Sequence, residues 1–164
     1  MIHFTKNECD SIINLSNTLQ KTERNEFPRP ISYDFYSIGY NNETKWIFDR
    51  LDSYFTETTG IEVVKSLDAV HLFDYSVGDR FGRHRDIYYV NQIHNIGVCL
   101  NEDYEGGDFV LYEPQYVVLP KKTGQIYTFK HSLEHEVLEV THGNRWSLIG
   151  FYFYEHLDLK KQLL

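Results

Sequence analysis

Two residues in the stretch FGRHRDIYYVNQ (81–92), His84 and Asp86, have side chains and a spacing that could bind a metal ion. Alternate residues of an extended chain point to the same side, so an H-x-D segment can aim an imidazole and a carboxylate at one point. With a second histidine from a distant strand, the pair would form the facial triad that holds Fe(II) and leaves coordination positions open. The stretch therefore predicts part of an iron site.

The same stretch permits a second interpretation, because His84 to Asn91 also fit the H-R-D-x-x-x-x-N pattern of a protein-kinase catalytic loop. A kinase also needs a Gly-rich loop, a V-A-I-K-type lysine and a D-F-G motif, none of which the sequence contains. We therefore interpret the kinase match as chance. A further H-x-D pair, His156 and Asp158, lies in a polar C-terminal segment, and we expect it to bind no metal.

The composition is typical of a globular protein from a reducing compartment. Of the 164 residues, 41% are hydrophobic and 24% charged, and the net charge of −8 disfavours a nucleic-acid surface. No apolar run reaches the roughly 18 residues of a membrane span, and the N-terminus lacks the pattern of a secretory signal. Cys9 and Cys99 form no C-x-x-C motif. We therefore expect a cytoplasmic protein with a single domain, 1–164, and no membrane contact.

The first part of the chain, about residues 1–62, is predicted to be helical. Thr5 and Glu8 form a capping box at the start of a helix over residues 5–19. The segment FPRPIS (27–32), with its two prolines, is predicted to be a loop.

A second helix is predicted over residues 42–60, with Gly60 as its C-terminal stop. The apolar residues that recur at helical spacing are Cys9, Ile12, Ile13 and Leu19 in the first helix and Ile47, Leu51 and Phe55 in the second.

From about residue 64 the pattern changes to short runs rich in Val, Ile, Tyr and Phe, separated by turn residues. The predicted strands are 69–76, 94–101, 108–113, 116–120, 125–130, 135–140 and 145–153, with breaks at 77–82, 102–107, 121–124 and 141–144. Many short strands at close spacing are typical of a sandwich, a barrel or a jelly roll. We therefore predict a mainly β fold with N-terminal helices, whose core spans about residues 64–155.

Several features in a fixed order resemble the prolyl 4-hydroxylase-like branch of the Fe(II)- and 2-oxoglutarate-dependent oxygenases. They are a tyrosine nine residues before the H-x-D histidine, an acidic-Gly-Gly turn, a V-x-P…G…F strand pair, and a histidine ten residues before a basic residue. In this chain they fall on Tyr75, Glu105-Gly106-Gly107, Val118 to Phe129, His135 and Arg145. The ordered set, over about residues 69–153, is far more specific than any one feature. We expect the two glycines to form a tight turn with positive φ.

The resemblance implies a double-stranded β-helix, a jelly roll of about eight strands. The N-terminal helices would cover one sheet and bury Ile12, Ile13, Leu51 and Phe55. The resemblance also implies that His84, Asp86 and His135 bind Fe(II), and that O₂ is a cosubstrate, with ascorbate as an accessory reductant.

Arg145 would, by the same resemblance, pair with the distal carboxylate of 2-oxoglutarate. A planar guanidinium holds a carboxylate through two parallel hydrogen bonds, which suits this role. Tyr75 and Ser147 could add hydroxyl donors to the same cosubstrate.

Three positions bear on the choice among relatives. Phe81 stands where the family often has a tyrosine near the substrate, and Cys99 stands where a strand tyrosine often contacts 2-oxoglutarate. Secreted collagen-type enzymes favour lysine at the position of Arg145, so the chain resembles intracellular or bacterial relatives better. These differences leave the substrate open but not the cofactors.

The resemblance implies an enzyme that hydroxylates a side chain of a protein or peptide, with proline as the expected residue. The same chemistry on a free amino acid or a nucleobase is an alternative, because Arg80, Arg83 and Arg85 lie beside the H-x-D pair. These arginines could equally neutralise acidic neighbours or hold an acidic peptide. A non-catalytic metal-binding scaffold is an alternative of another class, against which the complete ligand set and Arg145 argue. The sequence leaves the oligomeric state open.

Overall fold

The structure is a computed structural model that describes residues 3–26, 30–86 and 90–160. The helices in these ranges are α1 (Lys6–Asn14), η1 (Leu15–Asn17), α2 (Lys45–Thr59) and η2 (Tyr154–His156). The first strands are β1 (Lys21–Glu26), β2 (Ile31–Gly39), β3 (Glu62–Val63), β4 (Ala69–Tyr75), β5 (Arg80–His84), β6 (Gln92–Cys99) and β7 (Glu105–Gly106). The remaining strands are β8 (Phe109–Leu111), β9 (Val117–Val118), β10 (Ile126–Lys130), β11 (His135–Val137), β12 (Val140–His142), β13 (Arg145–Phe153) and β14 (Leu157–Asp158).

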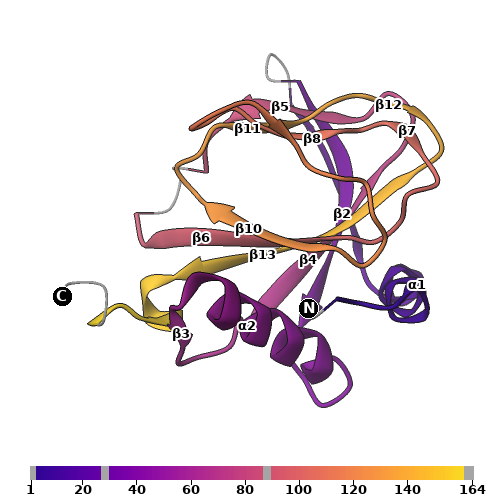
Figure 1. The fold of residues 1–164 in the computed structure, drawn as a ribbon. Helices are drawn as coiled ribbons and strands as arrows, with labels where there is room; N and C mark the ends of the chain where they lie inside the picture. The colour runs from indigo at the N-terminus through magenta and orange to yellow at the C-terminus, as the bar shows by residue number, and fades with distance from the viewer. Residues whose placement is uncertain (1–2, 27–29, 87–89, 161–164) are drawn as a thin grey trace.

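Most of these strands form one curled sheet in the order β10-β6-β13-β4-β2-β5-β11-β8-β9, with β1 beside β2. The sheet folds over into two layers because β2 takes part in both. Its residues 34–39 pair with β4, whereas Ile31 and Ser32 pair with β5 (Figure 1). Every strand pair in the described ranges is antiparallel. The arrangement is a jelly roll, which confirms the predicted fold class and excludes a parallel α/β sheet.

The two α-helices cover the outer face of the layer that contains β6, β13 and β4 (Figure 1). Ile12, Leu51 and Phe55 are fully buried there and Ile13 is partly buried, as expected from the helical spacing. Burial of each such side chain contributes about 1.5–3 kcal/mol. No helix within the described ranges has the length and apolar character needed to cross a lipid bilayer.

The helix ends follow the predicted local signals. The Thr5 side chain accepts a hydrogen bond from the Glu8 backbone and the Glu8 carboxylate accepts one from the Thr5 backbone, so the capping box is present. Gly60 ends α2 with φ of 71°, a left-handed conformation that favours glycine.

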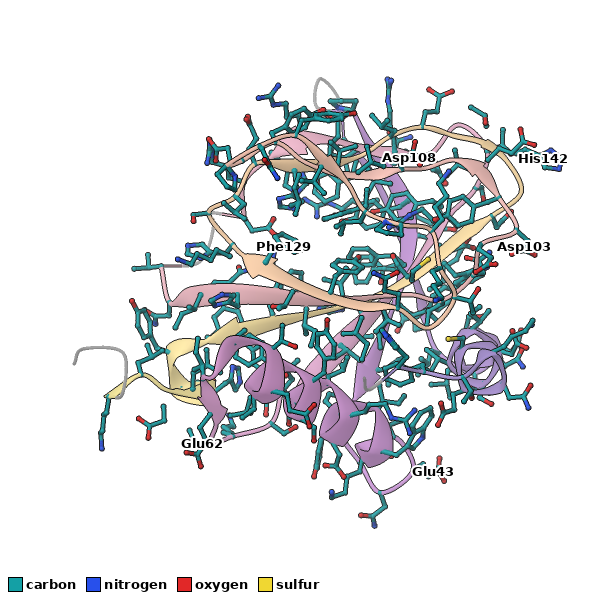
Figure 2. The ribbon with its side chains drawn as sticks, viewed as in Figure 1. Glu43, Glu62, Asp103, Asp108, Phe129 and His142 are labelled. Carbon is teal, nitrogen blue, oxygen red and sulfur yellow. The ribbon has the colours of Figure 1, made fainter. Side chains whose placement is uncertain are left out.

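A second core lies between the two layers. It consists of the buried residues Ile31, Tyr33, Tyr75, Phe109, Phe129, Val137 and Val140. Phe129 points into this space in Figure 2, whereas Glu43 and Glu62 lie on the outside, near the helices. The inner face of the jelly roll is therefore lined mainly by aromatic rings.

The sequence predicts that residues 1–62 are helical apart from one loop. This is wrong for the middle of the range, which forms β1 and β2. The strand β2 is apolar on both faces: Ile31 and Tyr33 enter the inner core, while Tyr36 and Ile38 pack under the helices. Residues 27–29 of the predicted FPRPIS loop lie outside the described ranges, and Ile31 and Ser32 belong to β2 rather than to a loop.

Further boundaries also differ from the predicted ones, and β7 and β12 overlap the expected breaks at 102–107 and 141–144. The expected break at 77–82 overlaps β5, so His84 ends a strand, and the expected strand at 135–140 divides into β11 and β12. The Gly106-Gly107 turn explains the division. Its φ angles are 67° and 59°, as expected, and a Cβ at Gly106 would lie 2.2 Å from the carbonyl oxygen of Glu139. The backbone between β11 and β12 thus lies against a site that only glycine fits.

The fold should lose stability in mild acid, in part through His94 on β6. Its ring packs edge-on against Phe55, and its Nδ1 is buried without a hydrogen-bond partner in the described ranges. Burial, reinforced by Lys130 and His131, lowers the pKa of His94 to about 4. Since an unfolded histidine titrates near 6.5, protonation favours the unfolded state, and stability is lost as the pH falls from about 6.5 toward 4.

The replacement His94→Phe, which keeps a ring against Phe55, should flatten this decline. One proton accounts for a slope of at most about 1.4 kcal/mol per pH unit. Urea unfolding of both proteins at several pH values between 7 and about 4.5 measures the difference, and the other buried histidines titrate in both. Parallel curves would contradict the assignment.

Candidate active site

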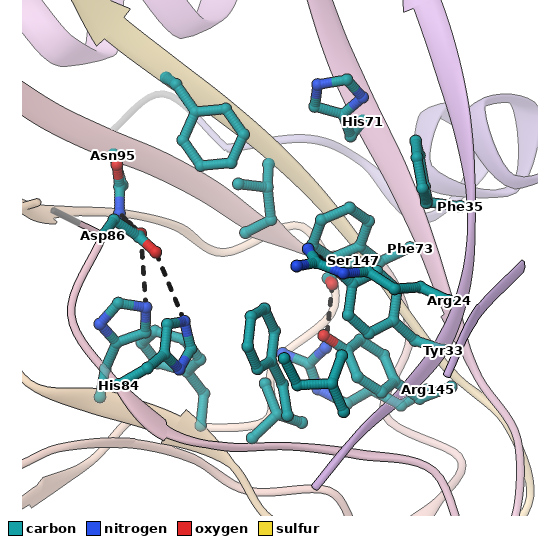
Figure 3. Close-up of a pocket in the computed structure, with 18 of the residues that line it drawn as sticks. Arg24, Tyr33, Phe35, His71, Phe73, His84, Asp86, Asn95, Arg145 and Ser147 are labelled. Carbon is teal, nitrogen blue, oxygen red and sulfur yellow. Dashed lines mark hydrogen bonds and ion pairs between the residues drawn. The ribbon is translucent and has the colours of Figure 1, made fainter. Parts of the chain in front are cut away.

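A cavity of about 480 Å³ lies between the two layers, and it contains two groups of polar residues. His84 and Asp86 lie at one side, together with His135, and Arg145 and Ser147 lie at the other (Figure 3). The predicted site residues therefore share one cavity, together with Tyr75.

The pairing of β5 with β11 brings the two histidines together. His84, the last residue of β5, is directly opposite His135, the first residue of β11. Asp86 follows two residues later, and its carboxylate oxygens lie 3.4 Å from Nε2 of His84 and 3.5 Å from Nε2 of His135. One ligand atom from each of the three residues lies within 4.8 Å of the others, so the three could hold one metal ion.

Backbone carbonyls hold both imidazoles with Nε2 facing the carboxylate. The Nδ1–H of His84 donates to the carbonyl oxygen of Gly82 (2.7 Å), and the Nδ1–H of His135 donates to that of Leu133 (2.8 Å). Phe81 stacks on the His84 ring with centroids 3.8 Å apart, so the phenylalanine supports a ligand instead of offering a hydroxyl. Hydrogen bonds of this kind fix the tautomer of metal-binding histidines.

The protonation states also suit a divalent cation. Burial lowers the pKa of His135, which favours the neutral imidazole. Burial alone would raise the pKa of Asp86, but its neighbours His84, His135 and Asn95 outweigh burial and lower it overall. Imidazole nitrogens from two histidines and one carboxylate form the donor set of a facial triad.

A second group of possible ligands, Asp68, Glu155 and His156, is unsuited to a metal ion. His156 Nδ1 accepts a hydrogen bond from the backbone N–H of Phe153 (3.0 Å), so in the neutral ring the proton occupies Nε2. Lys65 Nζ lies 3.4 Å from Asp68 and 3.6 Å from Glu155, and so forms an ion pair with each carboxylate. This group does not include Asp158, the other residue of the second H-x-D pair.

Arg145 carries a buried charge without an acidic partner. The residue is only 4% exposed, yet none of the described carboxylates forms an ion pair with it. Its Nη1 donates to Oγ of Ser147 (2.9 Å), its guanidinium carbon lies 5.1 Å from the ring centre of Tyr75, and its Nε has no hydrogen-bond partner among the described residues. Since a buried unpaired charge is unfavourable, this end of the cavity suits an anion, and the planar guanidinium suits a carboxylate.

Tyr127 of β10 completes this end of the cavity, and sequence reasoning missed it. Its hydroxyl is buried near Arg145 without a well-formed hydrogen bond to any described residue, and burial raises its pKa to about 12. The ring lies over Gly97, where a Cβ would lie 2.3 Å from it. Cys99, expected at the position of the family's strand tyrosine, is not among the cavity-lining residues, so Tyr127 supplies the phenol instead. A glycine inside the β6 strand was the available signal.

The three arginines beside the H-x-D pair are paired with glutamates. Arg85 makes two hydrogen bonds to the Glu113 carboxylate (2.5 and 2.7 Å). Arg83 lies 2.5 Å from a carboxylate oxygen of Glu134, and Arg80 lies 3.7 Å from one of Glu139. Of the roles that the sequence left open, neutralisation of acidic neighbours is the one these contacts fit.

The cavity also has an aromatic wall. Phe35, Tyr33, Phe73 and Phe81 line it, with Tyr33 within 4.8 Å of Phe73 and 5.4 Å of Phe81, measured between ring centres. Arg24 of β1 reaches the same wall, where it donates a hydrogen bond to the Tyr33 hydroxyl (2.8 Å). This surface suits an apolar group rather than an ion.

Residues 70–153 match the family model described as the 2OG-Fe(II) oxygenase superfamily. No curated protein sequence matches the chain. Among solved structures, an oxidoreductase of the 2OG-Fe(II) oxygenase family from Burkholderia pseudomallei is similar, with a TM-score of 0.76 at 17% identity. The match covers 94% of this chain and 82% of that one.

Two prolyl hydroxylases have the same fold at comparable similarity. A Pseudomonas putida prolyl-4-hydroxylase matches with a TM-score of 0.71 at 16% identity, over 93% of this chain and 89% of that one. The Trichoplax adhaerens prolyl hydroxylase was solved in complex with a hypoxia inducible factor oxygen degradation domain peptide fragment. It matches with a TM-score of 0.74 at 17% identity, over 89% of this chain and 76% of that one.

The unpaired charge of Arg145 should reduce the stability of the ligand-free protein. Arg145→Met should therefore raise the free energy of unfolding by about 1 kcal/mol, because an apolar side chain of similar length removes a buried charge. Urea unfolding measures the change. Arg85→Met, which removes an arginine that is paired at the surface, is the control and should change stability by less than about 1 kcal/mol. A loss of several kcal/mol in Arg145→Met would contradict this account.

Proposed function

This chain belongs to the 2OG-Fe(II) oxygenase superfamily, and on that premise we propose that it hydroxylates proline residues of a protein or peptide. The observation that carries the proposal is the shared cavity, which presents a facial triad at one side and an unpaired buried arginine at the other. The superfamily uses Fe(II), 2-oxoglutarate and O₂, and both polar groups of the cavity have a role with these cofactors.

His84, Asp86 and His135 would hold Fe(II). The donor set fits, since both rings donate Nδ1–H to backbone carbonyls and so present Nε2 toward the Asp86 carboxylate. When bound, iron and 2-oxoglutarate activate O₂ for insertion of one oxygen atom into an unactivated C–H bond. The chain contributes three ligands on one side of the ion, so that positions remain open for the cosubstrates.

Arg145 would bind the distal carboxylate of 2-oxoglutarate, with Ser147 and Tyr127 as neighbouring hydroxyls. The Ser147 oxygen accepts from Arg145, which leaves its own O–H free to donate to an acid. The Tyr127 hydroxyl has no partner among the described residues and could donate to the same carboxylate. Tyr75 contributes the face of its ring to the guanidinium, so its part is to position Arg145 rather than to donate.

The aromatic wall supports an apolar ring such as proline as the target. Its rings would bury the pyrrolidine beside the triad and exclude water from the reacting C–H bond. A free amino acid would need separate partners for its ammonium and carboxylate groups. Arg24 and Glu26, the other charged pair that lines the cavity, are bonded to each other (2.6 Å).

A nucleic-acid substrate and a non-catalytic scaffold each account for fewer observations. A nucleic-acid substrate would require basic surface, whereas Arg80, Arg83 and Arg85 are paired with glutamates. A metal-binding scaffold would use the triad but would have no need for the unfavourable burial of Arg145. The Trichoplax adhaerens neighbour, which was solved with a peptide, supports a peptide substrate.

The proposal is tested by incubation of the purified protein with Fe(II), 2-oxoglutarate, O₂ and proline-containing peptides. We expect a product that is heavier by one oxygen atom, located on proline by tandem mass spectrometry. His135→Ala is expected to yield no product, because a facial triad has no spare protein ligand. Product formation at the wild-type rate in this variant would refute the metal assignment, and oxidation confined to free amino acids or nucleobases would refute the substrate.

The role of Arg145 is tested by binding rather than turnover. A charge-assisted hydrogen bond contributes roughly 1.5–3 kcal/mol, so Arg145→Ala should weaken 2-oxoglutarate binding by about 10- to 100-fold. Arg145→Lys should be intermediate, since it keeps the charge but loses the two-pronged geometry. Anaerobic titration of the metal-loaded proteins measures both, with Arg85→Ala as the control. Equal affinity in all four proteins, with metal retained, would exclude the assignment.

A further inference from the structure

We infer that Gln92 and Asn95 form an amide relay that orients Asp86 and leaves one of its carboxylate oxygens for the metal, an inference that rests on the proposed metal centre. Both residues belong to β6 and line the cavity. They are among the most buried polar side chains of the described ranges, at 3% and 1% exposure. Neither is a metal ligand, and no sequence motif identified them.

The relay consists of two short hydrogen bonds in series. Gln92 Nε2 donates to Oδ1 of Asn95 (2.6 Å), and Asn95 Nδ2 donates to Oδ2 of Asp86 (2.5 Å; Figure 3). An ionised carboxylate only accepts hydrogen bonds, so Asn95 must present its amide nitrogen to Asp86 and its oxygen to Gln92. Gln92 therefore helps to hold Asn95 in the orientation that is useful to Asp86, because a flipped Asn95 amide would place its nitrogen against Gln92 Nε2 and its oxygen against Asp86 Oδ2.

The relay makes the two carboxylate oxygens of Asp86 unequal. Oδ2 accepts the hydrogen bond of the Asn95 amide and lies 3.5 Å from His135 Nε2, whereas Oδ1 lies 3.4 Å from His84 Nε2 and receives no amide hydrogen bond from the described residues. The backbone is also held, since the Asp86 N–H donates to the carbonyl oxygen of His131 (3.0 Å). Asp86 is thus fixed at its backbone and at one oxygen, and Oδ1, the oxygen without an amide partner, remains available to a metal ion held by the two histidines.

The cost of burying two amides supports a positioning role. Positions on the inner face of β6 could hold apolar residues, as most of the inner core does. A buried amide is tolerated when its hydrogen bonds are made, and a half-satisfied network is worse than an apolar one. Here Gln92 donates to Asn95, and Asn95 donates to Asp86. Partners of this kind, one step removed from the metal, orient its ligands and tune its affinity.

The test uses Co(II) binding to the metal-free protein, followed by visible absorption, and does not depend on activity. Asn95→Leu and Gln92→Met remove the two amides and keep similar side-chain volumes. Each should weaken Co(II) binding, by about 10- to 100-fold for Asn95→Leu and by a smaller factor for Gln92→Met. The double variant should bind Co(II) as Asn95→Leu does, because Gln92 acts only through Asn95. Gln20→Met, at an exposed glutamine, is the matched control and should bind like the wild type.

Urea unfolding of the metal-free proteins separates positioning from folding. If Gln92→Met unfolds too readily, Gln92→Ala removes the same amide without a longer apolar side chain and is expected to show the same dependence on Asn95. Unchanged Co(II) affinity in Asn95→Leu would overturn the relay. So would a loss of Co(II) affinity on replacing Gln92 that is the same in the wild type and in the Asn95→Leu variant. If wild-type binding of Co(II) is instead absent or insensitive to His135→Ala, the proposed metal centre itself fails.

Discussion

The two layers of the jelly roll depend on β2, whose backbone bonds to β4 along residues 34–39 and to β5 at Ile31 and Ser32. This one strand sets the distance between the layer that contains Arg145 and the layer that contains His84 and His135. Its side chains serve both cores, with Tyr33 inside and Ile38 under the helices. The helices therefore stabilise the cavity indirectly, because they hold the outer face of a sheet whose inner face forms the site.

The site has well-held ligand side chains at one end and polar groups without full hydrogen bonding at the other. Around the triad, each ligand side chain is held by a defined partner: carbonyl oxygens hold the two imidazoles, and Asn95 holds the carboxylate. At the opposite end, the Arg145 guanidinium and the Tyr127 hydroxyl keep unused hydrogen-bonding capacity. If Arg145 had a carboxylate partner within the protein, an added acid would gain little by binding there. The stability that the fold forgoes at Arg145 becomes available as binding energy.

The sequence predicts those features that depend on neighbours along the chain. The capping box at Thr5, the helical repeat of Leu51 and Phe55, and the stop at Gly60 are local signals, and all are present. The strand β1, Lys-Thr-Glu-Arg-Asn-Glu, has no apolar residue and owes its conformation to pairing with β2.

The site residues also divide into those that the sequence motifs predict and those whose place depends on strand pairing. The triad and Arg145 come together in one cavity because the ordered motifs correspond to one fold. Tyr127 could not be found from its own segment, because its place follows from its register opposite Gly97 on another strand. That register has a consequence for selectivity by length. The missing side chain at Gly97 lets the Tyr127 ring lie flat on β6 near Arg145, and the sheet fixes the span from the guanidinium to the triad. A diacid that bridges this span must have a matching number of carbons. The missing Cβ at Gly97 therefore helps to set which chain length of oxo-diacid the cavity accepts.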